Sequence, residues 1–236
     1  MSDIEERYDV KTAAAWILGH ARRTGIPALP ESLICKTADA CTEKERLEII
    51  AAGQTANLKL YPFKSGTQML ARTRRTMGFL HSVSFDTILD VGSGRGVFLI
   101  PFMKEFPLVQ VTSLDLLEKR VTFLNELADG GFRQLHAEQK NICDQPFPDG
   151  SFDIVTMLEV LEHIPDVKGA VASAVKMARQ YVVVTVPSKP DNNPEHIHLL
   201  TKDMLTGLFN EAGCTRLHFD GVEGHLFMVA AIRKQT

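Results

Sequence analysis

The sequence predicts an α/β fold in which helices cover both faces of a mostly parallel β-sheet. Three observations point to this fold. A buried strand-like run leads directly into a glycine-rich turn and a helix at residues 87–102. Strand-like and helical segments alternate from about residue 84 onward, which is the pattern of a doubly wound parallel sheet. Two later strand-like runs are joined by a turn so short that they can only form an antiparallel pair.

The region before residue 84 contains only predicted helices. One covers residues 11–24 and is stopped by Gly25 and Pro27. A second begins with the capping-box pair Thr42 and Glu45 and runs to about residue 57. A third covers about residues 67–81 and carries an apolar face at helical spacing. We therefore expect an N-terminal helical cap over residues 1–83 and a core domain over residues 84–236.

The glycine-rich turn is the first part of a predicted cofactor cradle. The strand around Ile88 and Leu89 ends in a turn with a glycine at every second position, at Gly92, Gly94 and Gly96. Glycine permits positive φ and, because it lacks Cβ, lets a ligand lie against the backbone. Asp90 lies at the carboxyl end of this strand, where ligands bind in open α/β sheets.

A second predicted strand, residues 109–114, ends at Asp115, nineteen residues after Gly96. An acidic side chain at this place can accept hydrogen bonds from both ribose hydroxyls of a nucleoside. The combination DVGSGRG with Asp115 resembles motifs I and II of the class I S-adenosylmethionine-dependent methyltransferases. This resemblance implies a Rossmann-like, mostly parallel seven-stranded sheet with an antiparallel last strand, and S-adenosylmethionine as the cofactor.

The resemblance continues in register along QKNICDQPFPDGSFDIV at residues 139–155 and MLEVLEHIPD at residues 157–166. Asn141 stands where the family usually has Asp; it keeps an acceptor oxygen for the adenine amino group but lacks the charge. Ile142 would flank the adenine ring. The resemblance covers about residues 84–232 and implies a cofactor site made of Asp90, Gly92, Ser93, Gly94, Gly96, Asp115, Leu116, Asn141, Ile142 and Glu159.

The remaining elements follow the same topology. Residues 181–186, YVVVTV, predict a fifth strand. A helix over residues 201–212 is capped by Thr201 and closed by Gly213. Strands over residues 215–220 and 227–232 flank the turn GVEGH and form the predicted antiparallel pair. Nicotinamide dehydrogenases generally lack such a reversed last strand, which favours the methyltransferase fold.

Titratable side chains follow the fourth and fifth strands, where a base would take the proton of a hydroxyl or amine acceptor. The candidate catalytic residues are Glu159, His163 and His198. An alternative comes from a second resemblance, to the small-RNA 3′-end 2′-O-methyltransferases. It implies a divalent metal that would lower the pKa of the attacking hydroxyl, held by Glu159, Glu162, His163 and His198. The favoured interpretation has no metal. At most one of His196 and His198 is expected to face the site, because residues i and i+2 point to opposite sides of an extended segment.

Composition narrows the possible partners. The formal net charge of −3 over 236 residues gives no general attraction to nucleic acid or to an anionic membrane. No apolar run approaches the roughly 20 residues of a membrane span, and the polar start is not that of a signal peptide. We therefore expect a cytoplasmic protein with no membrane partner. The four cysteines form no CxxC pair, which argues against a structural zinc site.

The function that the sequence favours is transfer of a methyl group to an oxygen or nitrogen of a small-molecule acceptor. RNA 2′-O-methylation with the Glu/His cluster, and a non-catalytic S-adenosylmethionine-binding module, are the alternatives. One feature bears on RNA: aromatic and basic side chains gather before the core at Tyr61, Phe63, Lys64, Arg72, Arg74 and Arg75. Such a group could stack a base and hold a phosphate, but a solvated face is the favoured interpretation. The oligomeric state is left open.

Overall fold

The computed structural model describes residues 7–64, 69–190 and 192–232. They divide into two compact units that interleave along the chain. The helical unit comprises Met1–Gln68, Gly94–Pro107 and Leu117–Ala137, and the sheet unit comprises Met69–Ser93, Leu108–Leu116 and Glu138–Thr236. The predicted division into a cap and a core domain at residue 84 stays a prediction.

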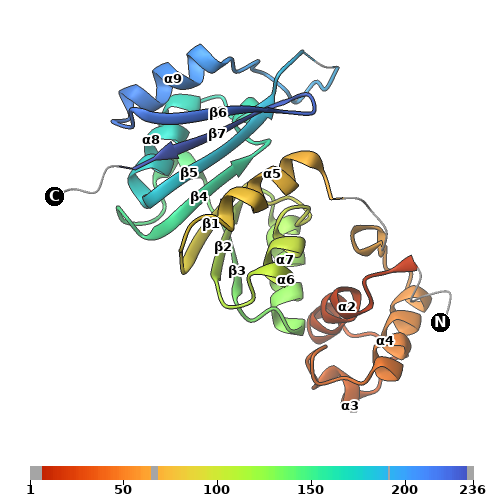
Figure 1. Cartoon of the computed structure of the whole chain (residues 1–236). Coiled ribbons are helices and arrows are strands. Elements are labelled where there is room, and N and C mark those ends of the chain that lie inside the picture. The colour runs from red at the N-terminus through yellow and green to blue at the C-terminus, as the bar shows by residue number, and fades with distance from the viewer. Residues whose placement is uncertain (1–6, 65–68, 191, 233–236) are drawn as a thin grey trace. The chain divides into compact units, whose positions relative to one another are not determined.

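Seven strands form one sheet in the order β3-β2-β1-β4-β5-β7-β6. The strands are β1 (Thr87–Val91), β2 (Gln110–Asp115), β3 (Leu135–Gln139), β4 (Phe152–Leu158), β5 (Ala178–Pro187), β6 (Arg216–Val222) and β7 (His225–Ala231) (Figure 1). β1 pairs in parallel with β2 and β4, and β4 pairs in parallel with β5. β7 is antiparallel to both β5 and β6. The predicted mostly parallel sheet with a reversed last strand is confirmed.

Alternation along β5 separates the two faces of the sheet unit. Val182, Val184 and Val186 face one side and join the core with α8 (Val167–Met177) and α9 (Lys202–Glu211). Tyr181 faces the other side, where the edge of its ring meets Phe79 of α5 (Ala71–Leu80) at a centroid distance of 5.2 Å. The unit also contains two short 3₁₀ helices, η2 (Ile142–Asp144) and η3 (Leu161–His163).

The helical unit is built around close contact between two helices. It contains α2 (Val10–Thr24), α3 (Glu31–Ile34), α4 (Glu43–Thr55), η1 (Tyr61–Phe63), α6 (Leu99–Glu105) and α7 (Glu118–Gly130). A Cβ on Gly19 of α2 would lie 1.8 Å from the carbonyl oxygen of Glu126 in α7, so only glycine permits this approach. The buried Glu126 carboxylate is paired: one oxygen accepts from Trp16 Nε1 at 2.9 Å and the other lies 2.9 Å from His20 Nδ1.

Local sequence signals place most element boundaries within three residues. The Thr42–Glu45 capping box is present, and Thr201 caps α9 by accepting from the backbone N–H of Met204. The predicted third helix begins at Ala71, and residues 67–68 of that prediction lie outside the described residues. β5 begins at Ala178, three residues before the predicted start, because α8 passes directly into the strand.

Candidate functional site at the carboxyl edge of the sheet

The turn after β1 adopts the backbone conformation that the glycine spacing predicts. Gly92, Gly94 and Gly96 have φ values of 67°, 59° and 73°, in the left-handed region. A Cβ on Gly92 would lie 2.7 Å from Cγ2 of Val160, so this position also requires glycine for space. The N–H of Gly92 donates to the carbonyl oxygen of Leu114 at 2.7 Å, which ties the turn to β2. Gly94 and Gly96 belong to the helical unit.

Asp90 is held inside the sheet unit rather than presented to solvent. It is 3% exposed, and its Oδ1 accepts a hydrogen bond from Thr156 Oγ1 at 2.6 Å. Burial raises the pKa of Asp90 to about 6, and the hydrogen bonds from Thr156 and Ser93 offset this only in part. Ser93 Oγ also donates to the Asp90 carbonyl at 3.1 Å and accepts from Ser113 Oγ at 2.7 Å. Asp90 and Ser93 therefore brace the start of the turn.

The end of β2 combines a buried carboxylate with an exposed apolar side chain. Asp115 is 5% exposed, whereas the next residue, Leu116, is 62% exposed. Gln139 Nε2 donates to the Leu116 carbonyl oxygen at 3.0 Å and fixes the backbone there. The predicted contacts of Asp115 with the ribose hydroxyls and of Leu116 with the base stay predictions.

Asn141 and Ile142 lie at the start of η2. Asn141 Oδ1 accepts from the backbone N–H of Cys143 at 3.1 Å and caps η2. A carbonyl oxygen has a second lone pair, so this oxygen retains capacity for one further donor. Ile142 is 4% exposed and packs into the core of the sheet unit. Its predicted contact with an adenine ring stays a prediction.

Glu159 directly follows β4 and has the strained φ of 59°. Its backbone N–H donates to the carbonyl oxygen of Thr185 in β5 at 2.9 Å. Its Oε2 lies 2.9 Å from Nε2 of His225. Its Oε1 and the Oγ1 of Thr185 are buried and have no hydrogen-bond partner among the described residues. Two buried oxygens without partners are costly unless a ligand supplies hydrogen-bond donors.

His225 and Thr185 are site residues that the sequence analysis did not name. β7 runs antiparallel to β5 and pairs His225 with Pro187, so the first residue of β7 reaches the carboxyl edge of β5. The turn GVEGH followed by a reversed strand could have indicated that His225 lies at this edge. His225 Nδ1 lies 3.1 Å from the carbonyl oxygen of Glu223. The His225 ring is thus held between the Glu223 carbonyl oxygen and the Glu159 carboxylate.

His163 and His196 lie side by side, whereas the side chain of His198 is bonded elsewhere. Ligand atoms of Glu162, His163 and His196 lie within 4.8 Å of one another, and the two imidazole rings meet edge to face at 4.7 Å. His163 Nδ1 is 2.9 Å from the Glu195 carbonyl oxygen. His198 Nε2 is instead 3.1 Å from the carbonyl oxygen of Ile164. Among the described residues, the cluster of possible ligand atoms thus contains the side chain of His196 and not those of His198 or Glu159.

The aromatic and basic group before the core is divided between the two units. Phe63 is 1% exposed and stacks on Phe123 inside the helical unit. Tyr61 is exposed in the same unit, with Arg95 5.8 Å from its ring centroid. Arg75, by contrast, belongs to the sheet unit and pairs with Asp220 at 2.8 Å. Phe63 is therefore not available to stack on a base.

Comparison with known proteins relates part of this chain to methyltransferases. A family model described as a methyltransferase domain matches residues 89–184. The chain is 34% identical over 144 residues to 27-O-demethylrifamycin SV methyltransferase of Amycolatopsis mediterranei, covering 56% of this chain and 52% of that protein. It is 54% identical over 44 residues to ribosomal RNA small subunit methyltransferase G of Bacillus pumilus, covering 19% and 18%. The chain thus spans about half of the first relative's length and less than a fifth of the second's.

The fold is also similar to that of solved methyltransferase structures. A solved structure of a SAM-dependent methyltransferase from Aquifex aeolicus superposes with a TM-score of 0.58 at 19% identity, over 69% of this chain and 90% of that one. Within the described residues, no helix has the length and apolarity needed to cross a membrane. The sheet order, the glycine turn and the family match lead to one conclusion. Residues 89–184 match the methyltransferase-domain family model, and the sheet has the fold of the class I S-adenosylmethionine-dependent methyltransferases.

Proposed function

We propose that this protein transfers a methyl group from S-adenosylmethionine to an oxygen or nitrogen of a small-molecule acceptor. The observation that carries the proposal is the pair of buried oxygens without partners, Glu159 Oε1 and Thr185 Oγ1. Both lie at the carboxyl edge of the sheet, where open α/β folds bind their ligands. A carboxylate oxygen only accepts hydrogen bonds, so its ligand must present a donor. A hydroxyl or an amine meets this requirement.

The turn after β1 and the end of β2 supply a fitting place for the cofactor. The positive φ of Gly92 turns the chain directly after β1, and the cofactor would lie against the backbone of this turn. Asp115 would accept from the ribose hydroxyls, and Leu116 would cover one face of the base. When bound, S-adenosylmethionine supplies a methyl group that its positive sulfur already activates. The protein therefore has mainly to align the acceptor and exclude water.

Glu159 would take the proton that the acceptor loses. Its Oε1 is the free acceptor atom, while its Oε2 is held by His225 at 2.9 Å. Fixing one carboxylate oxygen orients the other, which is the arrangement that general base catalysis requires. Of the candidate catalytic residues, His163 would line the acceptor side and His198 would support the loop through Ile164. The name of the Amycolatopsis relative denotes a substrate that lacks an O-methyl group, which supports an oxygen acceptor.

RNA is the second candidate acceptor, and two observations favour it. The local identity to ribosomal RNA methyltransferase G is high over a short segment. Glu162, His163 and His196 also form a cluster of a kind that could hold a divalent metal. This candidate predicts activity that is lost with a chelator and RNA affinity that falls steeply with salt. The negative net charge and the burial of Phe63 favour the small molecule instead.

Calorimetric titration of S-adenosylmethionine and S-adenosylhomocysteine tests the first step, with NADH as the control. We expect the first two to bind with micromolar affinity and NADH not to bind. Screening then follows S-adenosylhomocysteine release with small phenols, amines and short RNAs, with and without a chelator. Turnover of phenols or amines that resists the chelator supports the proposal, and turnover of RNA alone supports the second candidate. Cofactor binding with no turnover of any acceptor would instead favour a non-catalytic binding module.

A further inference from the structure

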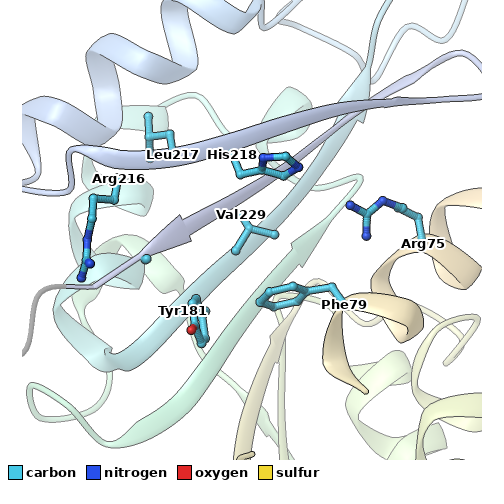
Figure 2. Close-up of a pocket in the computed structure, with 8 residues that line it drawn as sticks. Arg75, Phe79, Tyr181, Arg216, Leu217, His218 and Val229 are labelled. Carbon is cyan, nitrogen blue, oxygen red and sulfur yellow. The ribbon is translucent and has the colours of Figure 1, made fainter. Parts of the chain in front are cut away.

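A hollow of about 350 Å³ lies in the sheet unit between α5, β5, β7 and β6 (Figure 2). Strand pairing shows where it is. Ala231 of β7 pairs with Tyr181 on one side and Arg216 on the other, which makes one row across the three strands. Val229 and His218 form the next row on the same face of the sheet. Tyr181 lies near the start of β5, six residues before Pro187, so roughly 20 Å of strand separates the hollow from the carboxyl edge.

Side-chain size explains why the hollow exists. Ala231 is the smallest side chain of its row and lies between the two largest, Tyr181 and Arg216. Further along the sheet, α5 closes the same face. Arg75 pairs with Asp220 at 2.8 Å, and its guanidinium lies 4.5 Å from the ring centroid of Phe227. The helix thus covers the Phe227 row but leaves the Ala231 row open on the β6 side.

The lining has an apolar floor and a basic rim, as the sticks in Figure 2 show. Phe79 and Tyr181 meet edge to face and, with Val229, form the floor. Arg75 is neutralised by Asp220, whereas Arg216 is exposed and makes no ion pair with any described residue. The Tyr181 hydroxyl likewise has no hydrogen bond within the described part of the chain. The guanidinium of Arg216 and the hydroxyl of Tyr181 therefore remain for a ligand, beside the imidazole of His218, which also lines the hollow.

We propose that this hollow is a second binding site, for a small aromatic carboxylate. An aromatic ring would pack on Phe79, Tyr181 and Val229, because ligand pockets are mostly apolar with a few polar groups that orient the ligand. The carboxylate would pair with Arg216, whose planar fork matches a carboxylate in two parallel hydrogen bonds, and would accept from the Tyr181 hydroxyl. The site does not depend on the proposed function, since it shares no residue with the carboxyl edge.

Titration of the full chain with 2-naphthoate tests the proposal, with 2-naphthalenemethanol as the uncharged counterpart. We expect naphthoate to bind at one site and the alcohol to bind about tenfold more weakly, because it lacks the charge that Arg216 would pair. Arg216→Ala should weaken naphthoate by a similar factor, and Arg216→Lys by less. Arg133→Ala, which changes an exposed arginine of the helical unit, is the matched control and should bind as the wild type does.

Filling the hollow gives a second test that leaves every charge in place. Ala231→Leu should weaken naphthoate about tenfold, because the added side chain occupies the floor between Tyr181 and Arg216. Saturating S-adenosylhomocysteine should leave the affinity for naphthoate unchanged. No binding to the wild type, equal affinity in Arg216→Ala, or competition by S-adenosylhomocysteine would each overturn the proposal. If Ala231→Leu does not fold, Arg216→Ala still tests the proposal, because residue 216 is exposed and its replacement should leave the fold intact.

Discussion

Glu159 has a strained backbone conformation and a buried side-chain oxygen, Oε1, without a hydrogen-bond partner among the described residues. A positive φ at a non-glycine residue costs about 1–3 kcal/mol and persists only where surrounding structure holds it. Here the backbone bond to Thr185 and the side-chain pair with His225 hold it. The same two contacts leave Oε1 buried without a partner. The strained backbone and the pair with His225 fix the orientation of Glu159 Oε1, as the position of a base would require.

Replacing this carboxylate tests its role as a base. Glu159→Gln keeps the side-chain length but removes the charge that would accept the proton, so turnover should fall about 100-fold. Cofactor affinity by calorimetry should change far less than turnover. Glu223→Gln makes the same chemical change at an exposed position nearby and should leave turnover intact. Wild-type turnover in Glu159→Gln would remove Glu159 from the mechanism.

Asp115 tests the cofactor assignment. Asp115→Ala should weaken S-adenosylmethionine binding by about 1–3 kcal/mol, because the ribose hydroxyls would lose their charged acceptor. Calorimetric titration measures the change directly. Asp203→Ala removes an exposed carboxylate in the first turn of α9 and should bind the cofactor normally. If Asp115→Ala also binds normally, the ribose contact is misassigned.

The element that distinguishes this site is the turn between β1 and α6, where conformation and space both demand glycine. Comparison with a second glycine separates the requirement for positive φ from the requirement for space. At Gly92, φ is 67° and a Cβ would meet Val160 at 2.7 Å, whereas at Gly25, φ is 77° and nothing lies within 4 Å. Gly25 therefore carries the conformational requirement without the steric one.

This contrast gives a prediction for stability measured by urea unfolding. Gly25 has φ 77° and ψ 145°, a conformation essentially restricted to glycine, so Gly25→Ala should lower the free energy of unfolding by about 1–3 kcal/mol. Gly92→Ala should lower it by more, because β-branched Val160 has little freedom to move away. In a Val160→Ala background, Gly92→Ala should lower the free energy of unfolding by less than it does in the wild type, because the smaller side chain removes the steric clash. Equal losses at Gly25 and Gly92 would show that space at Gly92 does not matter.

Element types were readable from the sequence because they depend on local signals: the capping box at Thr42, the alternation of strands with helices, and the short turn before β7. Element edges and site partners depend on contacts distant in sequence. β5 starts at Ala178, directly after α8, because this residue already pairs with Phe152 of β4. The Glu159–His225 pair joins two strands that are not neighbours along the chain, so no local pattern announces it.

At the scale of the whole molecule, Asp153 ties three strands of the sheet together. Its Oδ2 accepts from the backbone N–H groups of Asp86 and Thr87 before and within β1, at 2.9 and 3.0 Å. Its Oδ1 accepts from Arg179 and Gln180 of β5, at 3.0 and 3.2 Å. Burial alone would raise the pKa of Asp153, but these hydrogen bonds outweigh it and hold the pKa well below its usual range.

A carboxyl with a lowered pKa binds its proton less tightly in the folded than in the unfolded protein. Its stabilisation is therefore complete above the unfolded value of about 4 and is lost as the pH falls. Asp153→Asn should lower the free energy of unfolding at pH 7 by about 2 kcal/mol and should flatten its decline between pH 5 and 3. Asp203→Asn should keep the wild-type profile. An unchanged acid limb in Asp153→Asn would show that the network does not govern acid unfolding.

The position of β7 has a consequence for how the protein is made. β7 follows every other strand along the chain, yet it lies inside the sheet between β5 and β6. On the ribosome, β6 emerges first and has no strand to pair with, while β5 keeps an open edge of the kind that promotes aggregation. The glycine turn and Asp115 can be in place long before, but Glu159 waits for His225. Under the proposed function, a nascent chain would thus form the glycine turn and place Asp115 before Glu159 is held by His225.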